Sequence, residues 1–175
     1  MTVLQGLIES PGTWTVAPAR STVRFTNKTL WGLVPVNGEF TDVSGHGEIA
    51  ANGAVSGRID IRVASLKTGI GKRDEHLRAD DFFAAGAHPE ITVVVTAVEP
   101  TGERTADLRA DLTVRGTTET LTLPATLERL GDDAVRVSTK TALDRTRFGV
   151  GGNPLGMLPT TTTLSADLVF TKADR

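Results

Sequence analysis

The sequence contains no cysteine among its 175 residues. This absence excludes disulfide bonds, thiolate nucleophiles and cysteine-ligated zinc at once. It is what a reducing compartment would favour.

The chain also has little net charge and no long apolar run. Its formal net charge is −2, so it has no basic surface of the kind that binds nucleic acid, and we expect no nucleic-acid partner. No apolar stretch approaches the roughly 20 residues that a membrane-spanning helix needs. Residues 1–14 lack a basic segment followed by a long apolar one, so we expect no secretory signal and a cytoplasmic protein.

Motifs for catalysis are scarce. The sequence has no G-x-S-x-G elbow and no Walker A segment. The glycine run TGIGKRD, residues 68–74, has Asp74 where a dinucleotide-binding pattern has its last glycine. Asp80 and Asp81 are adjacent, and adjacent side chains diverge in most backbones, which disfavours a paired-carboxylate site.

A metal site deserves separate consideration. His76 and Asp80 are four residues apart and could share a helix face, and His88 follows, so two histidines and one carboxylate are available. The alternative is a structural helix with acids near its start and Arg78 near its end, matched to the helix dipole. No H-x-H or H-E-x-x-H pattern occurs, so we favour the structural alternative and predict no metal and no cofactor.

The strongest positive signal is a period of two. In residues 107–115, apolar side chains alternate with polar ones, most of them charged, and a period of two recurs in 58–63, 91–95, 121–128, 135–143 and 164–170. Strands with one apolar and one polar face are typical of antiparallel sheets. Short turn signals such as Asn52-Gly53 and Gly116-Thr117 separate them. We predict one domain of roughly eight to nine strands, with a short helix near residues 72–79.

Such a meander can bury its apolar face as a two-sheet sandwich or as a closed barrel. Many of the inward candidates are Val, Leu, Ala and Thr, and the chain has only six Phe, two Trp and no Tyr. Small inward side chains leave room for a ligand in an eight-stranded barrel, but they can equally interdigitate as a solid core. The alternation alone leaves both interpretations open.

Two stretches do not follow the alternation. Residues 68–83, TGIGKRDEHLRADDFF, concentrate charge and aromatic side chains in a single non-strand insertion. Residues 30–40, LWGLVPVNGEF, carry Pro35, which restricts them to an edge, a bulge or a loop. Trp31 in this stretch either lines a pocket or plugs a barrel end.

The chain resembles the YceI-like family, also described as lipid- or polyisoprenoid-binding. The most specific match is the stretch from Arg73 to Phe83, followed by His88-Pro89, and the L-T-V-R-G segment at 112–116 is the next. Further matching pieces run in family order from about Trp14 to Phe170.

The resemblance implies an all-β protein with one or two short helices, folded as an antiparallel eight-stranded lipocalin-like barrel. We expect residues 1–12 to form an N-terminal extension and residues 13–172 to form the barrel domain. The family's role is non-enzymatic binding, storage or transport of a polyisoprenoid or similar lipid in an elongated apolar cavity. Two alternatives stay open: an enzyme that uses His76 with Asp74 or Asp80 on a small apolar substrate, and a filled-barrel interaction module that forms a homodimer through a sheet edge.

Within this picture the segment 68–83 crosses one end of the barrel as a loop and short helix. Arg73, Asp74 and His76 would either fix this cap to the strands or meet the ligand's head group. The apolar residues that we expect to line the cavity or seal it are Phe25, Trp31, Phe40, Leu66, Leu77, Phe82, Phe83 and Phe148.

Overall fold

The computed structural model describes residues 3–9, 11–29, 34–67, 89–114, 116–131, 133–144 and 161–172. These residues form almost only strands, together with one α-helix and two short 3₁₀ helices. The helices are α1 (Val3–Ile8), η1 (Pro18–Arg20) and η3 (Val63–Ser65). The strands are β1 (Gly12–Val16), β2 (Thr22–Thr29), β3 (Val34–Phe40), β4 (Val43–Ile49), β5 (Val55–Arg62), β6 (Leu66–Lys67), β7 (Glu90–Pro100), β8 (Thr105–Val114), β9 (Thr117–Gly131), β10 (Ala134–Asp144) and β11 (Thr161–Lys172).

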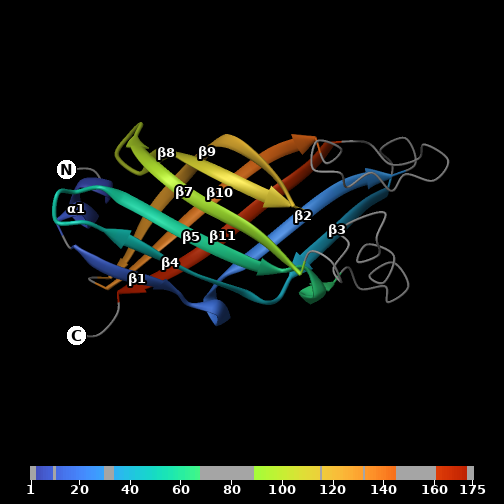
Figure 1. The fold of residues 1–175 in the computed structure, drawn as a ribbon, viewed down its shortest axis with the longest axis horizontal. Helices are drawn as coiled ribbons and strands as arrows, with labels where there is room; N and C mark the ends of the chain where they lie inside the picture. The colour runs from blue at the N-terminus through green and yellow to red at the C-terminus, as the bar shows by residue number, and fades with distance from the viewer. Residues whose placement is uncertain are drawn as a thin grey trace.

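The strands close into a barrel (Figure 1). Neighbours pair antiparallel in the order β1-β4-β5-β7-β8-β9-β10-β11, and β11 returns to β1 through the pairs from Trp14↔Lys172 to Val16↔Phe170. The predicted closed, eight-stranded antiparallel barrel is therefore confirmed, and the sandwich alternative is wrong. Closure satisfies the backbone groups that a sheet edge would leave unpaired.

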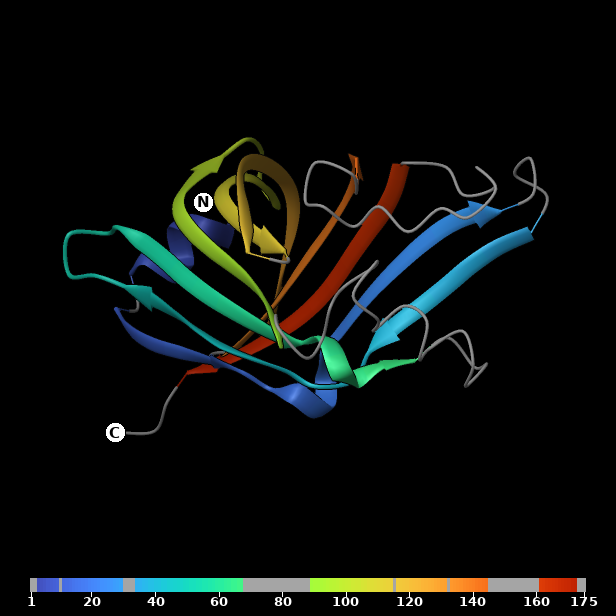
Figure 2. The ribbon, with the colours of Figure 1, turned by 45° about the vertical axis from the view of Figure 1, so that its right-hand side comes forward.

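Three of the eight long strands are each broken into two segments. β1 and β2 both pair with β11. On their other side, β1 pairs with β4 and β2 pairs with β3. β4 then pairs with β5, and β3 pairs with β6. The breaks in neighbouring strands are hydrogen-bonded to each other, as the Arg62 amide donates to the Asp42 carbonyl at 3.0 Å. Beyond the breaks β2, β3 and β6 diverge from β1, β4 and β5, which gives the barrel two arms (Figure 2).

The first break is made by local chemistry. Pro18 starts η1, and proline has no backbone N–H to give to a strand ladder. The Ser21 hydroxyl repairs the interruption, because it donates to the Ala17 carbonyl at 2.8 Å and accepts from the Val169 amide at 3.0 Å. One side chain thus replaces the missing contact between β11 and its neighbours.

The predicted alternation is realised in the barrel wall. On β8 the apolar set Ala106, Leu108, Ala110 and Leu112 is buried, while Arg109 between them is exposed. Charged side chains on the outer face pair with one another, for example Arg58 with Asp60 at 3.1 Å and Arg136 with Glu128 at 3.5 Å. Such exposed pairs contribute little to stability, so burial of the inner face holds the barrel together.

The backbone shows the outcome of two predictions, the turn at Asn52-Gly53 and the edge, bulge or loop position of Pro35. Gly53 has φ +88°, a left-handed conformation that glycine adopts without strain, and the Ala54 amide donates to Asn52 Oδ1 at 3.0 Å in this β4–β5 turn. Pro35 lies within β3, at a position that pairs only with β2 among the described residues, which is an edge position.

Candidate ligand-binding site

The helix α1, which the sequence pattern did not predict, lies at one end of the barrel (Figure 1). Its two leucines are buried, Leu4 at 4% and Leu7 at 6% exposure. Their spacing of three residues is a helical signal, but a six-residue segment is too short for that signal to be decisive.

On β9 the burial of the inward side chains falls with distance from α1. On β9, Leu127, Ala125 and Leu123 are 4%, 4% and 9% exposed. Leu121 and Glu119, which follow toward the other end of the same face, are only half-buried. The inner wall of β9 is therefore fully buried near α1 and half-buried away from it.

The next two strands around the barrel, β10 and β11, show the same change, whereas the inward residues of β8 stay buried along its whole length. On β10, Val135 is buried at 5%, and the inward positions after it as far as Leu143 are half-buried. On β11, Leu168 is buried at 8%, whereas Ala166 and Leu164 are half-buried. Phe170 is an exception, since it lies nearer α1 and is also half-buried.

Small residues widen the interior on the inner face of several strands. Gly47 of β4 and Gly57 of β5 are directly paired, and Ala110 and Ala166 take inward positions on β8 and β11. At Gly47 an added Cβ would lie 3.9 Å from the ring of Phe170, which is ordinary contact distance. At these four positions the wall reaches only a short way toward the barrel axis.

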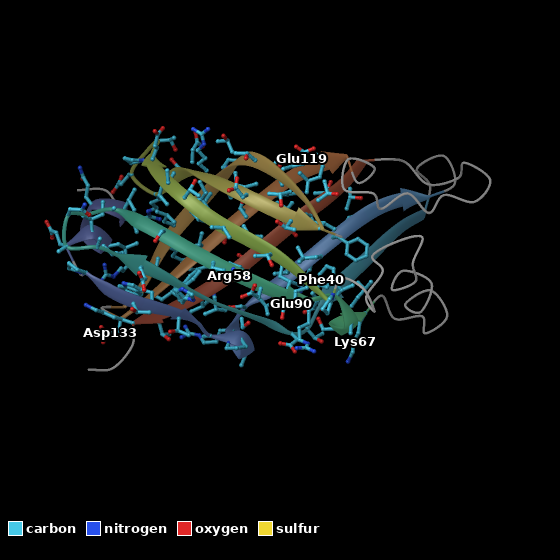
Figure 3. The ribbon with its side chains drawn as sticks, in the orientation of Figure 1. Phe40, Arg58, Lys67, Glu90, Glu119 and Asp133 are labelled. Carbon is cyan, nitrogen blue, oxygen red and sulfur yellow. The ribbon has the colours of Figure 1, made fainter. Side chains whose placement is uncertain are left out.

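Polar groups appear on the inner face at the end away from α1. Figure 3 shows Glu119 near that end of β9, and Thr141 takes an inward position on β10. Thr139 pairs with Ala125 and so lies nearer α1, where its hydroxyl donates to the Pro124 carbonyl at 2.7 Å. The interior is therefore mainly apolar, with Glu119 and Thr141 toward the end away from α1.

Trp14 is a buried residue that the sequence reasoning did not single out. It is 3% exposed, on the inner face of β1, and packs with Leu7, Ile49 and Val135. Its indole N–H, which can only donate, has no acceptor within hydrogen-bond distance in the described part of the chain. A buried donor of this kind is rare and costs about 1–3 kcal/mol.

Three of the predicted lining residues lie in the described structure, and they come together. Phe25 and Phe40 have ring centroids 5.9 Å apart, and Phe40 is the register partner of Leu66. They are 4%, 2% and 0% exposed and belong to the largest core cluster. Their contact with a ligand stays a prediction.

The other predicted site residues lie outside the described residues. These are the lining candidates Trp31, Leu77, Phe82, Phe83 and Phe148, and the cap candidates Arg73, Asp74 and His76. The short helix expected near 72–79 and the metal candidates Asp80 and His88 also lie there.

Two further searches bear on the site. Among the described residues no group of three or more His, Cys, Asp or Glu side chains could hold a metal ion. Within the same residues no helix combines the length and the apolar character that crossing a membrane requires.

A closed eight-stranded antiparallel barrel with an apolar inner face defines the lipocalin-like class of folds, whose members can hold a small ligand inside. Within that class the chain belongs to the YceI-like family, because the model of the YceI-like domain matches residues 14–170. The recognition made from the 73–83 and 112–116 segments is confirmed.

Curated relatives agree with this assignment. A UPF0312 protein from Pseudomonas syringae pv. tomato is 34% identical over 117 residues, which cover 64% of this chain and 59% of the relative. A UPF0312 protein from Pseudomonas putida strain GB-1 is 34% identical over 124 residues, covering 67% of this chain and 65% of that protein. The match therefore spans about three fifths of the length of these relatives.

Solved structures share the fold. BcnA from Burkholderia cenocepacia superposes with a TM-score of 0.80 at 26% identity, covering 88% of this chain and 98% of that one. A polyisoprenoid binding domain from Saccharophagus degradans superposes with a TM-score of 0.79 at 18% identity, covering 91% and 98%. At that identity the second likeness shows the fold alone.

Proposed function

We propose that this protein binds a long apolar amphiphile, a polyisoprenoid or a similar lipid, inside its barrel, and that it stores or transports this lipid without catalysing a reaction on it. The observation that carries the proposal is the fall in burial along the inner faces of β9, β10 and β11. Leu121, Leu143 and Leu164 take inward positions, yet they are only half-buried. Apolar side chains that face inward without being covered are what an apolar guest requires.

The distribution of polarity favours one orientation of the guest. The inner face is apolar near α1, and Glu119 and Thr141 lie toward the other end. An amphiphile would therefore place its tail toward α1 and its head group toward Glu119 and Thr141. Burial of each methylene group contributes about 0.8 kcal/mol, so a long tail alone would provide tight binding.

The comparisons support a binding role. The family is associated with polyisoprenoid binding, and the structural neighbour from Saccharophagus degradans is a polyisoprenoid binding domain. The proposal transfers that ligand class to this chain because the inner faces of β9, β10 and β11 carry apolar side chains that are only half-buried.

The first test is to identify what the protein carries. Protein purified without detergent is measured by native mass spectrometry, and its organic extract is analysed for lipids. Delipidated protein is then mixed with geranylgeraniol. We expect a prenyl or other long-chain lipid in the extract and a one-to-one complex with the added prenol.

The location of binding is tested by the same substitution on the two faces of the wall. Ala166 is half-buried on the inner face of β11, and Ala142 is exposed on the outer face of β10. Ala166→Trp fills the interior, so we expect it to weaken geranylgeraniol binding at least tenfold, while Ala142→Trp leaves it unchanged. Equal binding by both folded variants would place the ligand elsewhere and contradict the proposal.

A further inference from the structure

The helix α1 crosses the barrel end that it covers. Its two buried leucines reach different sides of the ring. Leu4 packs against Ala106 of β8 and Leu127 of β9. Leu7 packs in a second cluster with residues of β1, β4 and β10, namely Trp14, Ile49 and Val135.

Both ends of α1 are held by turns of the barrel. The Val3 amide donates to the Glu103 carbonyl at 2.8 Å, in the β7–β8 turn. At the other end of the helix, Ile8 Cγ2 lies 3.0 Å from where a Cβ on Gly53 would stand, in the β4–β5 turn. The helix is therefore fixed across the opening and does not merely lie beside it.

The helix completes a buried layer at this end of the barrel. Small side chains at Ala106 and Ala125 leave room beside them for the leucines of α1. Leu4 and Leu7 therefore pack with the larger inward residues Leu127 and Trp14, and all four are at most 6% exposed.

Helix α1 lies outside the residues that match the family model. The YceI-like domain model covers residues 14–170, whereas α1 comprises Val3–Ile8. A property that depends on α1 is therefore not implied by membership of the family.

We infer that Leu4 and Leu7 are specificity-determining residues that form the floor of the binding site and set the longest apolar chain that the barrel accepts. This inference rests on the proposed function. A tail that enters from the end near Leu143 extends along the apolar inner face until it meets the buried layer that Leu4 and Leu7 complete. Each methylene added below that limit raises affinity by up to about fourfold, and methylenes beyond it stay outside and add nothing.

The inference is tested by measuring affinity against chain length. Delipidated full-length protein is titrated with primary fatty alcohols of increasing length and with prenols from farnesol upward, and complexes are quantified by native mass spectrometry. For the wild type we expect affinity to rise with length and then level off. In Leu4→Ala/Leu7→Ala the levelling should begin at a chain longer by at least one isoprene unit.

A matched control lies at the end of the same helix. Glu9 follows α1 directly and is exposed, so Glu9→Gln should keep the wild-type limit. Leu7→Phe adds volume to the floor and should move the limit to shorter chains. Circular dichroism confirms that each variant is folded, and if the double variant does not fold, Leu7→Ala and Leu7→Phe carry the test.

The outcomes separate this inference from the proposed function. If the wild type shows a length limit that neither leucine substitution moves, the floor is elsewhere and the inference is wrong, although the proposed function stands. If the wild type binds no chain of any length, the proposed function fails and the inference fails with it.

Tryptophan fluorescence tests the packing of Leu7 at the floor without any ligand. The chain has two tryptophans and no tyrosine, so in a Trp31→Phe background Trp14 is the sole strong fluorophore. Trp14 packs against Leu7, so Leu7→Ala should let water reach the indole and shift its emission to longer wavelength. An unshifted spectrum would show that Leu7 does not seal this end.

Discussion

At the scale of single residues, a glycine opposite an aromatic ring decides how the β2–β3 arm packs. Gly38 is the register partner of Phe25, and the Phe25 ring lies where a Cβ on residue 38 would stand. The ring can therefore lie flat over β3 and reach Phe40. The absence of a side chain at this position makes the aromatic contact possible.

We predict that Gly38→Ala destabilises the protein by about 1–3 kcal/mol, because Phe25 must leave its position in the core. Gly47→Ala is the matched control. An added Cβ there would meet its nearest atoms at 3.6 and 3.9 Å, so its effect should stay within about 0.5 kcal/mol. Urea unfolding of both variants measures the difference, and equal stability would contradict the packing described.

At the scale of elements, the break between β1 and β2 depends on one hydroxyl. Ser21 Oγ bonds both the Ala17 carbonyl and the Val169 amide, and Val169 is 0% exposed. A buried amide that loses its acceptor has no hydrogen bond to offset the free energy of its removal from water.

We therefore predict that Ser21→Ala lowers the free energy of unfolding by about 1–3 kcal/mol. Ser44→Ala provides the comparison, since Ser44 is exposed on the outer face of β4 and should change stability by less than about 0.5 kcal/mol. Amide hydrogen exchange should also show faster exchange at Val169 in the first variant alone. Unchanged protection at Val169 would mean that its amide has another acceptor.

Elements differ in how well the sequence predicted them. The strands and the Asn52-Gly53 turn could be predicted because a period of two and a left-handed glycine are local signals. The break after Phe40 could not, because it depends on hydrogen bonds between neighbouring strands. Helix α1 was missed because its six residues are held by tertiary packing and not by their own helical preference.

At the scale of the whole molecule, a single sequence predicts neither whether the sheet closes into a barrel nor how far along the barrel each inward residue lies. Alternation left a sandwich and a barrel equally open, and pairing of β1 with β11 decides for the barrel. For the site, residue type predicted large apolar groups such as Phe25 and Phe40, which are fully buried. Leu121 and Leu164 were not singled out, because their half-burial depends on how far along the barrel they lie.

The central claim is that an apolar guest lies inside the barrel, against the uncovered inner faces of β9, β10 and β11. Methyl-labelled leucines allow this to be measured directly by nuclear magnetic resonance with geranylgeraniol. We predict intermolecular contacts from the prenol to Leu121, Leu143 and Leu164, and none to Leu130, an outward position on β9. Contacts to Leu130 with none to the three inward leucines would contradict the account.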